Sequence, residues 1–192
     1  MTASSSGANT RAWRFIILYV FAYLAASSAD LASTSLGLRR PGASEKNVFA
    51  TKGGEYAAAR AWALTAAGAV FMVGCIWFAK RNASRVDERW LAHPVRSFGK
   101  LYLSPFSEAA RRVSPLHLLA VAVAFVPMRL LAAANNLLVY YYGFGPIGEL
   151  IKAIGSRTSP LIGFAVGASA VFIALMLALA PLAARILRGW RG

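Results

Sequence analysis

The sequence contains four long stretches in which apolar residues dominate, separated by polar and often basic segments. A helix crosses the hydrocarbon core of a bilayer with about 20 residues, and each stretch is long enough to do so. The pattern therefore predicts four transmembrane helices at about residues 13–38, 56–78, 116–142 and 160–183. It favours an all-α integral membrane bundle that forms a single membrane domain over residues 1–192.

Basic residues collect on one side of this expected bundle. Arg11 and Arg14 precede the first stretch, the loop 79–115 is strongly basic, and further arginines follow the fourth stretch. The connecting segments 39–55 and 143–159 are close to neutral. Lys and Arg accumulate on the cytoplasmic side of membrane proteins, so we expect both termini and the middle loop in the cytoplasm. The membrane that we expect is a bacterial cytoplasmic (inner) membrane.

The composition supports a membrane protein and argues against two other classes. Hydrophobic residues make up 58% of the 192 residues, and the mean hydropathy is +0.53, whereas soluble domains are about 45–50% apolar. A net charge of +14 would suggest nucleic acid in a soluble chain. Here the charges lie between the apolar stretches, so we expect no nucleic-acid partner. The lone Cys75 can form neither an intrachain disulfide nor a zinc site.

The first stretch has a second interpretation. Arg11 and Arg14, then an apolar run, then the small residues Ser27, Ser28 and Ala29 resemble a signal peptide with its cleavage site. Cleavage would leave the other spans in the same orientation. Apolar residues return after Asp30, and the helical pattern has no break at Ala29. We therefore favour an uncleaved anchor.

The loop 79–115 interleaves basic residues with aromatic and aliphatic ones, and Pro94, Pro105 and Pro115 are expected to break it into short pieces. Such a mixture suits a segment in the membrane interface, where apolar groups enter the bilayer and cations meet anionic headgroups. We therefore expect anionic lipids of the cytoplasmic face to contact Arg85, Arg89, Trp90, Arg96, Lys100, Arg111 and Arg112. The alternative is a docking site for a protein partner, such as another membrane subunit.

Three features are expected on the outer side and in the fourth stretch. The tyrosines at 140–142 form an aromatic belt where the third stretch ends. The segment 146–155, opened by proline and closed by glycine, predicts a short helix on the outer surface. Gly163 and Gly167 form a GxxxG motif, continued by small residues to Ala174, which lets two helices approach closely in lipid. We expect this motif to pack within the chain's own bundle.

Polar residues inside the apolar stretches form the candidate site. They are Asp30 and Thr34 in the first stretch, Arg60 in the second, and Arg129, Asn135 and Asn136 in the third. An unpaired charge in a membrane costs at least a few kcal/mol. We therefore expect Asp30, the one acid within the stretches, to pair with Arg129, or with Arg60 if the helices are rotated otherwise. The cluster is either a structural hub or a binding site for an ion, a lipid headgroup or a small solute, and Arg60 is also placed to snorkel to the outer interface.

Catalytic patterns are missing from the sequence. His93 and His117 are not placed for paired haem ligation, and neither a phosphate-binding glycine loop nor a serine–histidine pair at one depth is present. We expect no cofactor and no metal, and we lean against an enzyme. The leading hypothesis is a non-catalytic accessory or scaffolding subunit of a larger membrane assembly. The alternative is a small transporter or lipid-binding protein that uses the polar cluster, and a lipid-modifying enzyme is third.

One short segment carries a family pattern. Asp30-x3-Thr34, followed by Gly37 and then Glu45-x-Asn47, resembles a pattern in an uncharacterised family of small bacterial and archaeal membrane proteins. The proline expected after Asn47 is absent here. The resemblance implies a small polytopic membrane protein and assigns no functional residue.

Overall fold

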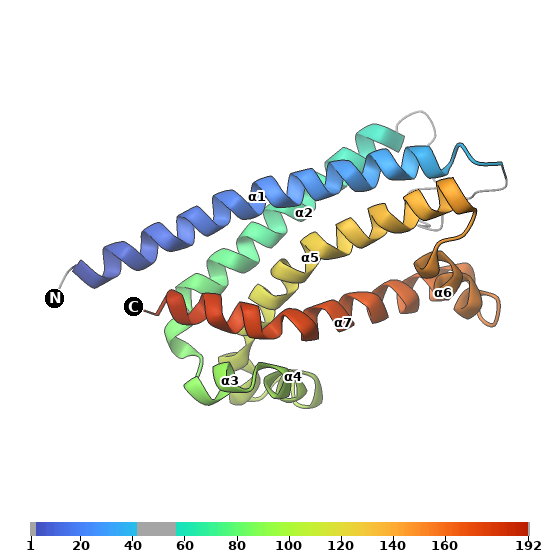
Figure 1. Cartoon of the computed structure of the whole chain (residues 1–192). Coiled ribbons are helices and arrows are strands. Elements are labelled where there is room, and N and C mark those ends of the chain that lie inside the picture. Colours follow the sequence, from blue (N-terminus) through green and yellow to red (C-terminus); the bar gives the residue numbers. More distant parts are fainter. Residues whose placement is uncertain (1–2, 42–56, 192) are drawn as a thin grey trace. The chain divides into compact units, whose positions relative to one another are not determined.

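The structure is a computed structural model that describes residues 3–41 and 57–191, and it consists mainly of helices, which short turns join from α2 onward (Figure 1). Helices account for 88% of this described part, which contains no strand, so the predicted all-α class is confirmed. The elements are α1 (Ala3–Gly37), α2 (Ala57–Arg81), the 3₁₀ turn η2 (Ala83–Arg85), α3 (Glu88–Ala92), α4 (Pro94–Leu103), α5 (Glu108–Tyr142), α6 (Pro146–Gly155) and α7 (Pro160–Gly189).

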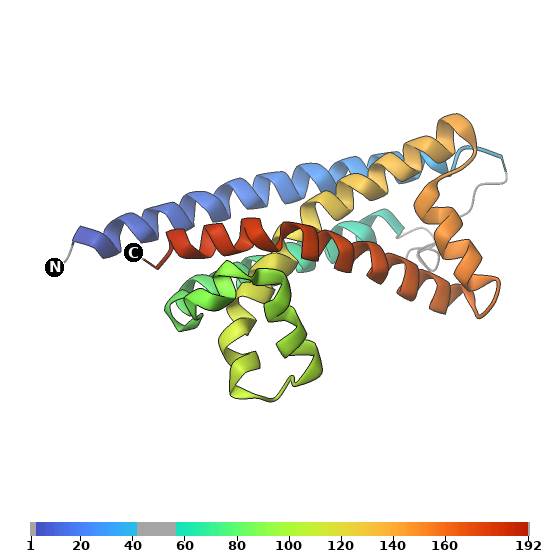
Figure 2. The same cartoon turned by 60° about the horizontal axis from the view of Figure 1, so that its bottom comes forward.

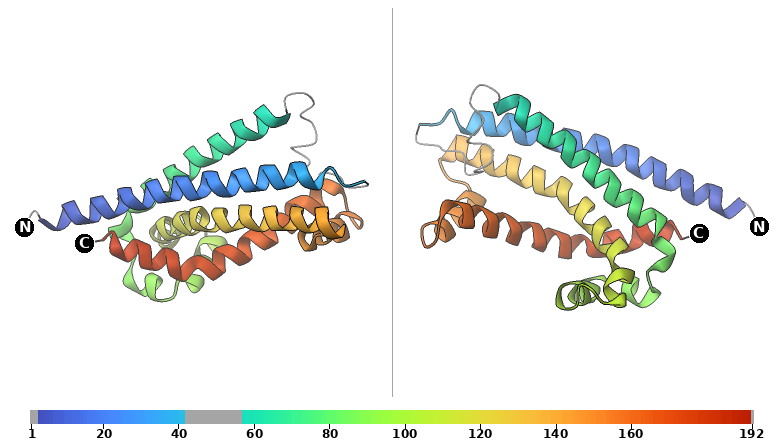
Figure 3. Two further views of the ribbon diagram at one scale, coloured as in Figure 1. Left: turned by 45° about the horizontal axis from the view of Figure 1, so that its top comes forward. Right: turned by 180° about the vertical axis from the view of Figure 1, so that it is seen from behind.

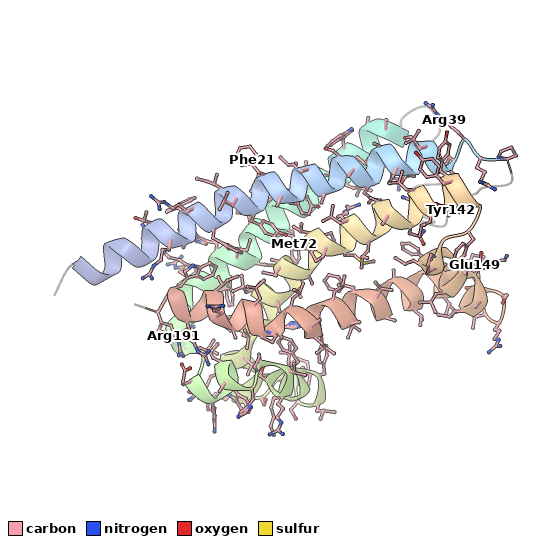
Figure 4. The ribbon with its side chains drawn as sticks, in the orientation of Figure 1. Phe21, Arg39, Met72, Tyr142, Glu149 and Arg191 are labelled. Atoms are coloured by element: carbon pink, nitrogen blue, oxygen red, sulfur yellow. The ribbon has the colours of Figure 1, made fainter. Side chains whose placement is uncertain are left out.

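Four of the helices are long and apolar enough to cross a membrane. The candidate spans are Asn9–Gly37, Ala58–Arg81, Glu108–Tyr142 and Pro160–Gly189, and they coincide with the four stretches predicted from the sequence. Side-chain exposure agrees with a lipid environment, because large apolar side chains face outward along these helices. Phe21, for example, is 69% exposed and projects away from α1, whereas Met72 of α2 is buried (Figure 4). The chain thus has the features of a multi-pass membrane protein.

Three helices extend beyond their predicted boundaries. The Ser-rich start of the chain predicts a disordered tip, but α1 already begins at Ala3. The fifth helix begins at Glu108 instead of near residue 116, and α7 continues to Gly189 instead of ending near residue 183. Hydropathy marks only the part of a helix that a bilayer covers, about 20 residues. Helical hydrogen bonding continues into polar sequence until a strong breaker ends it.

Pro115 lies inside α5, although it was expected to break the loop. A proline has no amide hydrogen, so the carbonyl four residues earlier, that of Arg111, loses its helical partner. The hydroxyl of Ser114 donates a hydrogen bond to this carbonyl at 2.8 Å. This bond replaces the missing one and allows the helix to continue.

The chain forms two compact units. The first unit comprises Met1–Ala22, Ala69–Phe125 and Leu175–Gly192, and the second comprises Tyr23–Gly68 and Val126–Ala174. The long helices therefore contribute to both units.

The first unit is held together by aromatic and charged contacts between its helices. The Tyr19 hydroxyl of α1 donates to the carbonyl of Ala122 in α5 at 2.9 Å, and the rings of Phe15 and Trp190 meet edge to face. The end of α7 and the segment that follows it bind the start of α3: Arg188 and Arg191 each donate to a different carboxylate oxygen of Glu88, both at 2.7 Å. Arg191 also donates to the carbonyl of Ala83.

Within the first unit, α4 and the beginning of α5 form a helical hairpin (Figure 2). Phe98 of α4 is buried and its ring packs against the edge of His117 in α5. The Tyr102 hydroxyl lies 3.0 Å from Nε2 of His117. Partial burial raises the pKa of the Tyr102 phenol above its ordinary value. Pro94 begins α4 and Pro105 lies in the turn, as predicted.

In the second unit, α6 packs across the start of α7 (Figure 3). A Cβ atom at Gly163 would lie 2.5 Å from the carbonyl oxygen of Ile151 and 2.7 Å from Cα of Gly155. A Cβ atom at Gly167 would lie 2.9 Å from the Ile151 side chain. The GxxxG motif therefore brings α6 against α7 within the chain. The expected continuation at Ala170 and Ala174 is exposed.

The turn from α5 to α6 depends on one glycine. Gly143 has a φ of +81°, a left-handed conformation common just after a helix. Its amide donates to the carbonyl of Val139. Arg40 donates to the carbonyl of Tyr140 at 2.8 Å, which places a cation at the negative end of the helix dipole. A side chain at position 143 would collide with the Arg40 guanidinium.

Candidate functional site

The centre of the candidate site is an ion pair between α1 and α5, in the second unit. Nη1 of Arg129 donates to Oδ2 of Asp30 at 2.8 Å, and the two side chains are 26% and 13% exposed, respectively. This is the pairing that the sequence analysis favours. In an environment of low dielectric, the attraction between the two charges offsets much of the cost of removing them from water.

Asn136 connects this pair to two hydroxyl groups. The hydroxyls of Ser33 and Thr34 both donate to the main-chain carbonyl of Asp30, at 2.9 and 2.8 Å. Their oxygen lone pairs are thereby free to accept hydrogen bonds. The side-chain amide nitrogen of Asn136 donates to the hydroxyl oxygen of Thr34 at 2.8 Å. It donates more weakly, at 3.4 Å each, to the hydroxyl oxygen of Ser33 and to Oδ1 of Asp30. The polar groups of the two helices thus partner each other.

Glycine allows α1 and α5 to approach at the same level. A Cβ atom at Gly37, the last residue of α1, would lie 3.2 Å from the main-chain oxygen of Asn136. This distance is shorter than most contacts of a Cβ atom, so a side chain at this position would require the main chain at Asn136 to shift by a few tenths of an ångström.

Tyr23 extends the cluster to α2. Its side chain is fully buried, and its hydroxyl donates to the carbonyl of Thr65 at 3.3 Å. It also interacts with Arg129. The hydroxyl lies so close to Gly68 that a methyl group there would collide with it. Sequence reasoning did not find Tyr23, although its spacing of seven residues from Asp30 places the two on one helix face.

Asn135 serves a different purpose from its neighbour. Its side-chain oxygen accepts hydrogen bonds from the amides of Ile147 at 2.9 Å and Gly148 at 3.4 Å. These are the second and third residues of α6, whose amides have no partner within the helix. Gly145, the residue that would normally supply a cap, has no side chain, and a Cβ atom there would lie 2.6 Å from the Asn135 oxygen. Asn135 therefore caps α6 and does not join the ion pair.

Arg60 is also outside the cluster. Its side chain is exposed near the start of α2, and within the described part of the chain it forms no ion pair. The predicted alternative, an Asp30–Arg60 pair, is wrong because Asp30 contacts Arg129. The exposed position is the one expected of an arginine that snorkels.

The seven residues of the predicted lipid-contacting set lie in the first unit and fall into two groups. Arg89 pairs with Asp87 at 3.0 Å and covers the ring of Trp90, and Arg112 pairs with Glu108. The other four, Arg85, Arg96, Lys100 and Arg111, are exposed and have no carboxylate within ion-pair distance among the described residues. This division could not be read from the sequence.

No protein-family model matches the chain, and neither a curated protein nor a solved structure matches it. The resemblance around Asp30, Thr34 and Gly37 therefore stays a prediction, and its remaining residues, Glu45 and Asn47, lie outside the described residues. In residues 3–41 and 57–191, no three His, Cys, Asp or Glu side chains come together to hold a metal ion.

Proposed function

We propose that this chain is a non-catalytic subunit of a larger membrane assembly, in which it has an accessory or scaffolding role. In this proposal it spans a bacterial cytoplasmic membrane four times, with both termini and the α2–α5 connection in the cytoplasm. The basic residues on that side support the orientation. Reporter tags inserted near Arg89 test it, because a tag outside the cell would contradict the proposed topology.

The hydrogen bonding of the polar cluster supports a structural role for it. Asp30, Thr34, Arg129 and Asn136 contact one another, and Asn135 caps α6. Polar contacts of this kind fix which helices are neighbours, because lipid is as apolar as leucine and cannot select between apolar faces. The cluster then explains how the chain folds, and an interaction surface has to lie elsewhere.

The observation that carries the proposal is an exposed small-residue face on α2. Two series of small residues at four-residue spacing differ in what covers them. The first, Gly163 and Gly167, is covered by α6. In the second, on α2, Ala59, Ala63 and Ala67 are all exposed in the structure. Such a face permits close approach of a helix from another subunit.

Copurification from native membranes in a mild detergent tests this proposal. We expect defined membrane proteins to accompany the tagged full-length chain in fixed proportion. Ala63→Leu fills the exposed face and should reduce their recovery several-fold. The matched control is Ala165→Leu, which makes the same change at an exposed position of α7 and should leave recovery unchanged. A monodisperse chain without partners, or equal losses in both variants, would contradict the proposal.

A second function is supported by a buried hydroxyl beside the ion pair. Ser27 lies one turn before Asp30 and is fully buried, and its Oγ has no hydrogen-bond partner among the described residues. A buried polar atom without a partner costs about 1–3 kcal/mol, so such an atom is often completed by water or a ligand. This favours a small transporter or a lipid-binding protein as the alternative. Asp30→Asn should then abolish binding while the protein still folds, whereas a hub predicts that stability falls.

A further inference from the structure

The segment 82–112, which joins α2 to α5 and includes the first residues of α5, carries more positive charge than its ion pairs neutralise. Each of its three acidic residues is already occupied: Asp87 by Arg89, Glu88 by the two arginines at the end of the chain, and Glu108 by Arg112. No carboxylate of the described residues is left to pair with the four remaining cations, Arg85, Arg96, Lys100 and Arg111, all of which are exposed. The surface therefore has an unbalanced charge that suits an anionic partner.

The tip of the α4–α5 hairpin exposes large apolar side chains. Leu103 is 86% exposed and Phe106 is 92% exposed. They lie at the end of α4 and in the turn that follows it (Figure 2). Burying a leucine or phenylalanine side chain is worth about 1.5–3 kcal/mol, so leaving both in water is unfavourable. An apolar environment is the natural place for this turn.

The faces of α4 separate these two kinds of side chain. Phe98 lies on the buried face, against α5. Val95 and Tyr102, two turns apart, share one exposed flank, and Arg96 and Lys100, one turn apart, share the other. A helix with one apolar flank and one basic flank is typical of segments that lie in the plane of a membrane interface.

We propose that the α4–α5 hairpin is an anionic-lipid-binding element of this protein. The side chains of Leu103 and Phe106 insert between the acyl chains of the adjacent leaflet. The four unpaired cations, defined above, bind the phosphate groups of anionic phospholipids.

A bilayer fits these observations better than other anionic partners. Nucleic-acid surfaces do not provide an apolar phase for Leu103 and Phe106. An acidic protein would need an apolar pocket that matches Leu103 and Phe106. The bilayer that α5 enters already provides an apolar phase next to the hairpin. The inference relies on membrane insertion and on no partner protein, so it is independent of the subunit role proposed above.

Quenching of a fluorophore by brominated lipids tests the proposal on the full-length protein. The variant Phe106→Cys, combined with Cys75→Ala so that one thiol remains, is labelled with bimane and reconstituted into nanodiscs. The nanodiscs contain brominated phosphatidylcholine, alone or mixed equally with brominated phosphatidylglycerol. We expect strong quenching at position 106 and little at a label on Ala92→Cys, an exposed position at the end of α3. Phosphatidylglycerol should increase the quenching at position 106.

A charge-matched pair of variants separates a specific headgroup contact from a general effect of net charge. Arg96→Gln with Lys100→Gln should lower the apparent affinity for phosphatidylglycerol by about five-fold per cation. Lys152→Gln with Arg157→Gln removes the same charge from α6 and the turn after it, and should leave the affinity unchanged. A label at position 106 that no lipid mixture quenches would overturn the proposal and indicate a protein-docking surface. Equal effects of the two variant pairs would also overturn it.

Discussion

Replacing Asp30 by asparagine is the sharpest test of the ion pair that joins α1 to α5. The change keeps the shape of the side chain and one acceptor for Arg129, but it removes the negative charge. The guanidinium would then remain in place, 26% exposed, without a counter-charge. We therefore expect Asp30→Asn to destabilise the folded protein.

The size of the effect follows from the geometry. Removing one partner of a well-buried pair costs about 3–5 kcal/mol, and an uncompensated arginine near the middle of a membrane helix costs about 2.5–3.5 kcal/mol. An ordinary hydrogen bond between membrane helices contributes about 0.6 kcal/mol. With a 2.8 Å contact between largely covered side chains, and with a residual hydrogen bond in the variant, we expect a loss of about 2–3 kcal/mol.

A double-mutant cycle measures whether this loss comes from the pair itself. Asp30→Asn, Arg129→Gln and the double variant are compared by reversible unfolding in mixed micelles, followed by far-ultraviolet circular dichroism. We expect the double variant to be more stable than the sum of the single losses predicts, by at least about 1 kcal/mol. The control is Glu149→Gln, at an exposed contact of 3.9 Å with Lys152, which should change stability by less than about 0.5 kcal/mol. Additive losses would refute the reasoning.

Three further predictions concern other contacts of the two units. Asn135→Ala removes the acceptor for the amide of Ile147 and should cost about 1 kcal/mol, seen as faster hydrogen exchange confined to the start of α6. Gly163→Leu cannot be accommodated against Gly155 and should lower the midpoint of thermal unfolding by several degrees, whereas an unchanged midpoint would contradict the close packing of α6 on α7. Because burial raises the pKa of the Tyr102 phenol, the folded protein keeps this proton to a higher pH than the unfolded chain does. Stability should therefore fall as the pH rises past about 10, and Tyr102→Phe should weaken that dependence.

The sequence allowed the apolar helices and the ion pair to be predicted for simple physical reasons. Hydropathy reports directly on what a bilayer can cover, so each of the four stretches coincides with a helix. The pair could be predicted because Asp30 is the one acid within the stretches, which left few possible partners. The choice of Arg129 over Arg60 depends on how the helices are rotated about their axes, and hydropathy does not report this rotation.

The roles of Asn135 and Asn136 show where prediction from sequence ends. Neighbouring residues on a helix point about 100° apart, so two adjacent asparagines contact different elements. Asn136 faces α1, whereas Asn135 faces the start of α6. Only the three-dimensional path of the chain after Gly143 decides that α6 begins there. The same holds for Arg89, whose ion pair with Asp87 depends on the turn that begins the short helix α3.

The second unit shows why the polar residues of α1 matter more for its folding than its many apolar ones. In lipid, an apolar side chain gains little by moving from the acyl chains to a neighbouring helix. Tyr23, Asp30, Ser33 and Gly37 follow one another at spacings of seven, three and four residues. Each contacts a neighbouring helix through a hydrogen bond, an ion pair or a close main-chain approach. These contacts have no equivalent in lipid, so they distinguish the correct neighbour from the bilayer. The face of α1 that carries them therefore specifies which helices it joins.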